Sequence, residues 1–155
     1  MIPRIRVYRP DDRPAVLRLV RDILAEFGFA PQTGGVERDL QEAHERYRGA
    51  AAGFWVAEID GEVVGTVAIR PKEGATCEIK RLYLRGDRRG AGLGQALYEH
   101  AEAFARTAGY ERIGLDSSRR FTGARRLYER NGFLLLAELD NDWEDNVYEK
   151  RLDFR

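Results

Sequence analysis

The chain lacks the features typical of secreted, membrane-spanning and nucleic-acid-binding proteins. Its 155 residues contain one cysteine, Cys77, so no disulfide can form within the chain. Lys plus Arg and Asp plus Glu both number 26, whereas a nucleic-acid-binding protein normally has a basic excess. The apolar runs are too short for a membrane span, and the first residues lack the apolar core of a secretory signal. We therefore expect a cytoplasmic protein with no nucleic-acid or membrane partner.

The hydrophobic pattern predicts one mixed α/β domain over residues 1–155, a length that fits a single core. A strand is expected around Ile5 and Val7. Apolar residues at three- and four-residue steps predict a helix over residues 16–27 and a second over 36–47. Strands at 54–59 and 63–69 flank Asp60-Gly61, which is a strong signal for a two-residue hairpin.

The strand expected over residues 76–84 is irregular. Cys77 and Ile79 alternate in one phase, and Leu82 and Leu84 alternate in the other. A change of phase within one strand indicates a β-bulge at Lys80-Arg81, which would bend the strand and free backbone groups for a ligand. The alternative is a strand that is buried on both faces, with Lys80 and Arg81 extending to the surface.

A glycine-rich turn joins this strand to a helix that is predicted to start near residue 93. Gly90, Gly92 and Gly94 leave the backbone open to an anion, and the first N–H groups of a helix attract negative charge. Glycines that serve tight packing alone are one alternative. A dinucleotide site, with Asp116 on the ribose, is a second, but Gln95 or Leu97 stands where its third glycine belongs. A P-loop is excluded because no Gly-Lys-Ser/Thr follows.

The later part of the chain predicts three more strands and one more helix. Strands are expected over residues 112–116, 134–139 and 147–152, with a short helix that ends at Gly132. The strand–helix–strand unit across residues 76–116 predicts a parallel, right-handed crossover.

Three motifs together resemble the GNAT superfamily of N-acetyltransferases. Residues 89–94, Arg-Gly-Ala-Gly-Leu-Gly, match its Arg/Gln-x-x-Gly-x-Gly/Ala signature. Residues 78–84 resemble its central strand, and the pattern from Ala124 through Tyr128 to Phe133 resembles its second motif. The order and spacing also match, over about the C-terminal half of the chain. One departure is Phe121, which stands where the family often has an Asn.

The resemblance implies a single GNAT-like domain and acetyl-CoA as co-substrate. The fold would have a mixed central sheet of about six to seven strands, with a bulged and splayed central strand, and about four helices. The pantetheine arm would lie in the splay against the backbone of Leu82, Tyr83 and Leu84. The pyrophosphate would lie on the N–H groups of Arg89, Gly90, Ala91, Gly92, Leu93, Gly94 and Gln95.

Two side chains are candidates for proton transfer to and from an amine acceptor. Glu78 lies on the central strand near the expected bulge, so it is our first candidate for the general base; a salt bridge on the sheet surface is the alternative. Tyr128 matches the tyrosine that the family uses to protonate the CoA thiolate. Direct transfer by these groups needs no metal and no covalent enzyme intermediate.

Other expectations concern the acceptor, the assembly and the alternative function. By analogy, residues 29–35 and 140–146 would line the acceptor groove, with Trp143 as an aromatic wall. A homodimer is expected from the resemblance alone. The alternative to an enzyme is a catalytically silent acyl-CoA-binding module, in which the phosphate site is kept and transfer is lost.

Overall fold

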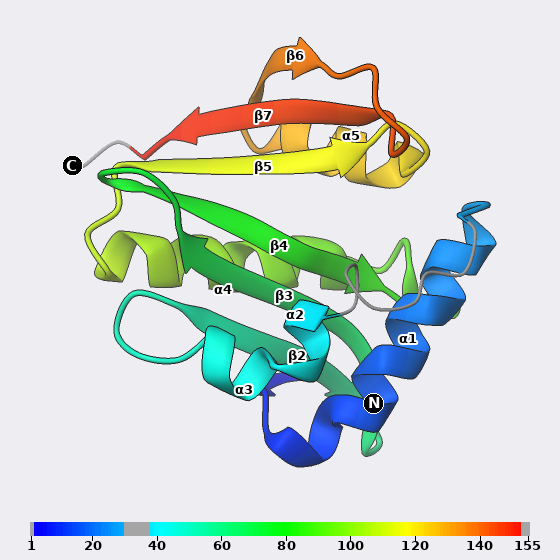
Figure 1. Ribbon diagram of the computed structural model, residues 1–155. Helices are drawn as coiled ribbons and strands as arrows, with labels where there is room; N and C mark the ends of the chain where they lie inside the picture. The colour runs from blue at the N-terminus through cyan, green and yellow to red at the C-terminus, as the bar shows by residue number, and fades with distance from the viewer. Residues whose placement is uncertain (1, 30–37, 153–155) are drawn as a thin grey trace.

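The computed structural model describes residues 2–29 and 38–152, which form one mixed sheet with helices on both faces (Figure 1). Its strands are β1 (Arg4–Val7), β2 (Gly53–Ile59), β3 (Glu62–Pro71), β4 (Thr76–Leu84), β5 (Arg112–Ser118), β6 (Leu134–Glu138) and β7 (Asp145–Arg151). Its α-helices are α1 (Arg13–Glu26), α2 (Arg38–Gln41), α3 (Ala43–Arg46), α4 (Leu93–Thr107) and α5 (Thr122–Arg130). Within the described residues, none of these helices has the length and apolar character needed to cross a bilayer.

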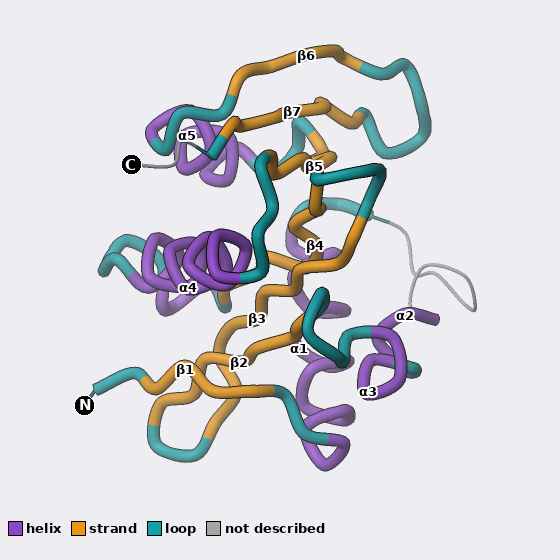
Figure 2. The backbone as a smooth tube through the Cα atoms, turned by 90° about the vertical axis from the view of Figure 1, so that its left-hand side faces the viewer, coloured by secondary structure: helices purple, strands orange, loops and turns teal. Residues whose placement is uncertain are grey.

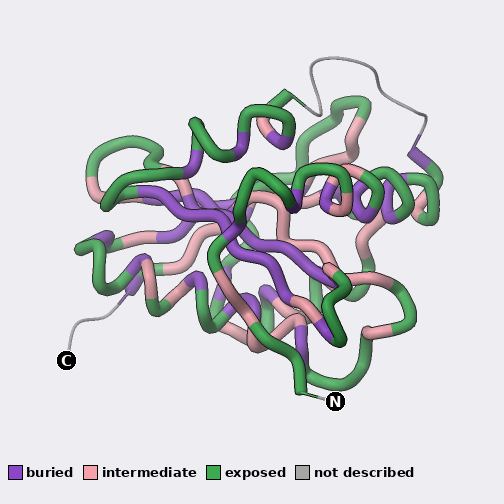
Figure 3. Tube along the Cα trace, turned by 90° about the horizontal axis from the view of Figure 1, so that it is seen from below, coloured by how far each residue is buried: buried purple, intermediate pink, exposed green. Residues whose placement is uncertain are grey.

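The sheet has seven strands in the order β1-β2-β3-β4-β5-β7-β6. Neighbouring strands are antiparallel except for β4 and β5, which are parallel and are joined through α4. Helices α4 and α5 lie on one side of the sheet, and α1, α2 and α3 lie on the other (Figure 2). Figure 3 shows that burial is concentrated in the central strands, which both layers cover.

The predicted hairpin and bulge are both present. Asp60 and Gly61 have φ values of 53° and 81°, which suits the twist of the flanking strands β2 and β3. The pairing of β3 with β4 shifts between Thr66 and Ala68, and Arg81 has a φ of 56°. The bulge explains the phase change in the sequence, because it returns Leu82 and Leu84 to the core face shared by Cys77 and Ile79.

The central strands separate soon after they pair. Strand β4 pairs with β5 only where Thr76–Glu78 face Arg112–Gly114. Both strands continue, to Leu84 and Ser118, without further pairing to each other. This is the splay expected from the resemblance, and it leaves one edge of β4 open.

The predicted helix over residues 36–47 is two short helices. Residues 36 and 37 lie outside the described residues. The helix is interrupted before α3, where Glu42 has non-helical dihedral angles. Leu40, Ala43 and Tyr47 are buried, as their three- and four-residue spacing predicted. Burial of these side chains positions each piece separately, so the apolar spacing was informative although the helix is not continuous.

Candidate active site

The splay between β4 and β5 opens into a cavity of about 1290 Å³. Its walls come from β4, the glycine-rich loop, the end of β5 and helix α5. Eight predicted cofactor-binding residues line it: Leu82, Tyr83, Leu84, Arg89, Gly90, Gly92, Gly94 and Gln95. The other two do not line it: Ala91, on the loop, is exposed, and Leu93, the first residue of α4, is buried in the core.

The glycine-rich loop presents a row of free backbone donors to this cavity. Gly90 and Gly92 have φ values of 86° and 88°, and a Cβ added to either would meet no atom within 4 Å. Helix α4 starts after Gly92 without a side-chain cap. Among the described residues, no hydrogen-bond acceptor pairs with the N–H groups of residues 90–95, and the next one, Ala96, bonds Gly92 at 3.0 Å. Six free donors at a helix start form a site for an anion.

Arg89 holds the loop in place with its side chain. Its Nε donates to the Leu84 carbonyl at 3.0 Å, and its guanidinium donates to the Glu26 carboxylate at 2.6 and 3.1 Å. The guanidinium also lies 5.1 Å from the centre of the Phe27 ring. Arg89 therefore fixes the glycine-rich loop to the ends of β4 and α1.

Gln95 ties the start of α4 to the end of α5. Its side-chain amide and that of Asn131 exchange two hydrogen bonds, both 2.8 Å long. Arg130 donates to the same Gln95 oxygen at 3.2 Å. The loop that presents the free donors is thereby held against the helix that carries Tyr128.

Tyr128 lies at the cavity wall with an unused hydroxyl. The residue is 5% exposed, and its ring packs on Phe133 and Tyr148 at 5.7 Å between ring centres. No hydrogen bond to the hydroxyl is present within the described part of the chain. Burial, with a smaller contribution from Tyr83 and Tyr148, raises the pKa of Tyr128 well above its ordinary value of 10. The phenol is therefore protonated at neutral pH and able to donate into the cavity.

Glu78 lies at the apex of the splay, opposite Gly114 in the last β4–β5 pair. It is buried, and its Oε1 accepts from Nε and from a terminal nitrogen of Arg70, each at 2.9 Å. Arg70 lines the cavity, whereas Glu78 stands behind it, outside the lining residues.

Aromatic side chains line the other mouth of the cavity. Phe29 and Trp143 stack with ring centres 4.7 Å apart, and Phe121 meets Phe27 edge-on at 5.0 Å. Phe27, Phe121 and Trp143 are among the lining residues, so this part of the cavity wall is aromatic; contact of Trp143 with an acceptor stays a prediction. Of the expected groove segments, residues 30–35 lie outside the described residues. Phe121, which replaces the family's usual Asn, contributes a ring instead of an amide.

Several charged lining residues were not among the predicted catalytic or cofactor-binding residues. Lys80, Arg81 and Asp116 line the cavity, and so do Arg70 and Asp39. Burial raises the pKa of Asp116, and the nearby Glu78 carboxylate raises it further. Asp116 stands two residues after Gly114 in an apolar strand, and that isolated charge was the available signal.

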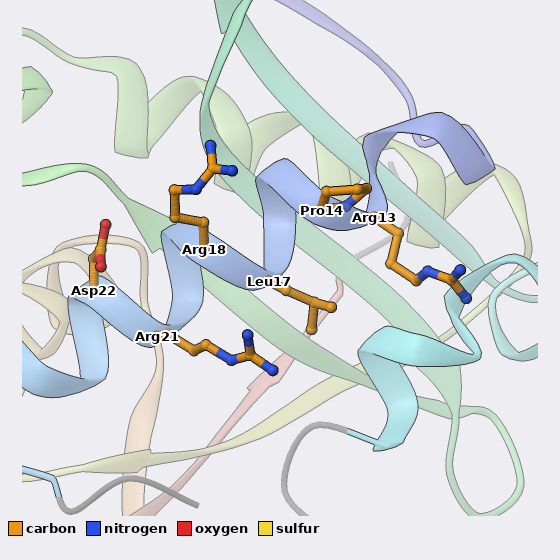
Figure 4. Close-up of a pocket in the computed structure, with 6 residues that line it drawn as sticks. All are labelled: Arg13, Pro14, Leu17, Arg18, Arg21 and Asp22. Atoms are coloured by element: carbon orange, nitrogen blue, oxygen red, sulfur yellow. The ribbon is translucent and has the colours of Figure 1, made fainter. Parts of the chain in front are cut away.

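A second, smaller hollow of about 420 Å³ lies on α1 (Figure 4). Its lining combines Arg13, Arg18 and Arg21 with Leu17, all on one helix. None of these residues lines the larger cavity.

Comparisons with known proteins identify the family and the fold. The model of the acetyltransferase (GNAT) family matches residues 17–133. The uncharacterised N-acetyltransferase YjgM of Escherichia coli is 34% identical over 136 residues, which cover 84% of this chain and 81% of YjgM. A GNAT-family acetyltransferase from Staphylococcus aureus superposes with a TM-score of 0.90 at 18% identity, over 98% of this chain and 100% of that one.

A further solved structure, YncA from Salmonella typhimurium, was determined with its cofactor acetyl-CoA. It superposes with a TM-score of 0.77 at 21% identity, over 99% of this chain and 95% of its own. At these sequence identities the two structures establish the fold alone. The family model covers residues 17–133 and the E. coli relative is 34% identical, so the chain belongs to the GNAT family of acetyltransferases.

Proposed function

We propose that this chain transfers the acetyl group of acetyl-CoA directly to the nitrogen of an amine. The observation that carries the proposal is the row of unpaired N–H groups at residues 90–95, beside the open edge of β4. A pyrophosphate matches this row in charge and in acceptor count. The GNAT family membership supports acetyl-CoA as the molecule that brings it.

The rest of the co-substrate would follow the splay. The pantetheine arm lies along the free edge of β4 and bonds the backbone of Leu82, Tyr83 and Leu84, as an added strand would. The bulge at Arg81 supports this placement because it turns that edge away from β5. The acetyl group then lies between Tyr128 and the apex of the splay.

The chemistry requires two protons to leave nitrogen and one to reach sulfur. Deprotonating an ammonium at pH 7 costs about 4–5 kcal/mol, and Glu78 accepts this proton through water. The free amine attacks the acetyl carbonyl, the C–N bond forms and the C–S bond breaks. Nitrogen loses its second proton to water, while Tyr128 protonates the thiolate and regains its proton from solvent. The net products are an amide, the CoA thiol and one proton.

Two measurements on the full chain test this function. Coenzyme A should shift the amide signals of residues 89–95 in an NMR titration and leave that of Gly109, at the far end of α4, in place. Thiol release should then depend on an added amine from a panel of amino acids, polyamines, aminoglycosides and peptides. If coenzyme A shifts those signals but no amine promotes release, the chain is the silent binding module. If the signals do not move, the cofactor site is wrong.

We also propose a homodimer in the cytoplasm. Leu134, Leu135 and Leu136 are exposed on β6, which is an edge strand of the sheet. An apolar edge of this kind favours pairing with a second copy. Sedimentation equilibrium of the chain and of Leu136→Lys tests it: the wild type should sediment as a dimer and the variant as a monomer. A monomeric wild type would exclude the dimer.

A further inference from the structure

The cavity is more basic than the chain as a whole. The chain has equal numbers of acidic and basic residues, yet the cavity lining contains more basic than acidic side chains. Three of the basic side chains are on the glycine-rich loop or on α5: Arg89, Arg126 and Arg130. The others lie away from that loop, on α2, α3, β3 and β4: Arg38, Arg46, Arg70, Lys80 and Arg81. A pyrophosphate on the loop does not account for this second group.

Internal ion pairs neutralise part of the second group. Three of its arginines have a carboxylate partner within 3 Å; these pairs are Arg46–Glu42, Arg70–Glu78 and Arg81–Asp39. Lys80 is different, because no carboxylate lies within 4 Å of its ammonium among the described residues. It is half-buried and lines the cavity. Its positive charge acts to lower the pKa values of Asp39 on α2 and of Asp116 on β5.

The strand register places Lys80 and Asp116 across from each other. Glu78 faces Gly114 in the last β4–β5 pair, and beyond it the two strands no longer pair with each other. Two residues further along each strand are Lys80 and Asp116, which therefore share one face of the sheet. That face is the one covered by α1, α2 and α3, opposite the helix α4 (Figure 2).

These two charges face each other without contact. Asp116, like Lys80, forms no ion pair within 4 Å in the described part of the chain, and both line the cavity. Paired neighbouring strands lie about 4.8 Å apart, and the splay widens that spacing here. The gap thus has room for a small group between one cation and one anion.

We propose that Lys80 and Asp116 together bind the zwitterionic head group of an α-amino acid, which is the acetyl acceptor. Asp116 receives the ammonium group and Lys80 receives the carboxylate. The neighbouring Glu78 then lies on the same face, where it accepts the proton that the ammonium loses. This inference rests on the proposed transferase function and names the class of its acceptor.

Other acceptor classes fit the two charges less well. A polyamine would place positive charge against the basic side chains of β3 and β4. A peptide N-terminus has the ammonium but no carboxylate one carbon away, so Lys80 would stay unpaired. Because the ammonium and carboxylate of an amino acid are one carbon apart, a site with one cation and one anion on facing strands matches both.

The test compares each common L-amino acid with its primary amide and its decarboxylated amine, in the thiol-release assay with saturating acetyl-CoA. The wild type should give a kcat/KM at least about tenfold higher for the best acid than for its amide, because the amide loses a charge-assisted hydrogen bond. Lys80→Gln should bring that ratio close to one. Asp116→Asn should lower kcat/KM for both molecules.

Lys72→Gln is the matched control. Lys72 also acts electrostatically on Asp116, but it does not line the cavity, so its loss should leave the ratio of acid to amide as in the wild type. The inference is overturned if the amide or the decarboxylated amine reacts as well as the acid. It is overturned equally if Lys80→Gln lowers kcat/KM for acid and amide by the same factor.

A binding measurement keeps this inference separate from the transferase function. If no amine promotes thiol release, the same amino acids are titrated into the CoA-bound protein by calorimetry. Binding that is lost in Lys80→Gln and kept in Lys72→Gln supports the head-group site although the transferase function has failed. No binding, or equal binding to both variants, overturns the site.

Discussion

Arg81 and Asp39 form a largely buried ion pair across 42 residues of chain, with a guanidinium nitrogen 2.6 Å from Oδ1 and Nε 3.1 Å from Oδ2. Arg81 is the bulge residue of β4, held at a φ of 56°, and Asp39 lies on α2. The Tyr47 hydroxyl donates to the same carboxylate at 2.9 Å. The pair therefore fastens the strained part of the central strand to the helical layer above it.

Removing one member of this pair should destabilise the fold strongly. Arg81→Met leaves the Asp39 carboxylate buried without its cation, which should reduce the free energy of unfolding by about 3–5 kcal/mol. Adding Asp39→Asn to that variant should recover part of the loss. Urea denaturation followed by circular dichroism measures both. Arg85→Met is the control, because the Arg85 pairs with Asp87 and Glu62 are exposed and should cost less than about 1 kcal/mol. Equal losses in the two single variants would contradict a special role for Arg81.

The same ion pair predicts how the free energy of unfolding depends on pH. Burial alone would raise the pKa of Asp39, but the hydrogen bonds and charge of Arg81 outweigh burial and lower that pKa below its ordinary value of 3.8. The unfolded chain therefore binds this proton more readily, so the stabilisation is fully present above about pH 4–5 and is lost as the pH falls through the native pKa. Urea midpoints between pH 3 and 7 should fall less steeply towards acid for Asp39→Asn than for the wild type. Parallel curves would show that Asp39 does not titrate in this way.

The sequence predicted local features better than long-range contacts. The bulge followed from the phase of four apolar residues, and the hairpin followed from Asp60-Gly61, because both signals lie within one strand or turn. The free donors at residues 90–95 followed from glycines at a helix start. The partners of Glu78 and Arg81 could not be predicted, since Arg70 and Asp39 come from other elements and no local pattern marks them. The roles of Glu78 and Tyr128 remain predictions.

Gly92 should matter for cofactor affinity beyond its effect on stability. Gly92 and Gly109 stand at the two ends of α4, both have a φ of 88°, and a Cβ added to either meets nothing within 4 Å. Alanine at either position should therefore lower the free energy of unfolding by about 1–2 kcal/mol through conformational strain. Only Gly92 lines the cavity, so Gly92→Ala alone should also weaken acetyl-CoA binding, because its Cβ stands over the free donors.

Calorimetric titration with acetyl-CoA, below the unfolding range of both variants, separates the two effects. We expect the dissociation constant to rise at least about tenfold for Gly92→Ala and to stay near the wild-type value for Gly109→Ala. The same affinity in both variants would place the pyrophosphate elsewhere.

Tyr128→Phe and Tyr110→Phe should have opposite effects. The Tyr128 hydroxyl has no partner within the described residues, so its removal should change the free energy of unfolding by only a few tenths of a kcal/mol while the ring packing on Phe133 and Tyr148 stays. The Tyr110 hydroxyl donates to the Ala51 carbonyl at 2.6 Å and lies away from the cavity, so Tyr110→Phe should cost about 1 kcal/mol and leave turnover as it is.

Turnover and its pH profile decide whether Tyr128 donates the proton. Loss of a general acid should lower kcat by about 10² in Tyr128→Phe, with the dissociation constant of acetyl-CoA nearly unchanged. Because burial raises the pKa of Tyr128 above 10, this hydroxyl stays protonated, and kcat of the wild type should show no loss from its ionisation up to pH 10. A Tyr128→Phe enzyme with wild-type kcat would remove Tyr128 from the mechanism and leave the protonation of the thiolate to water or to Tyr83, which also lines the cavity.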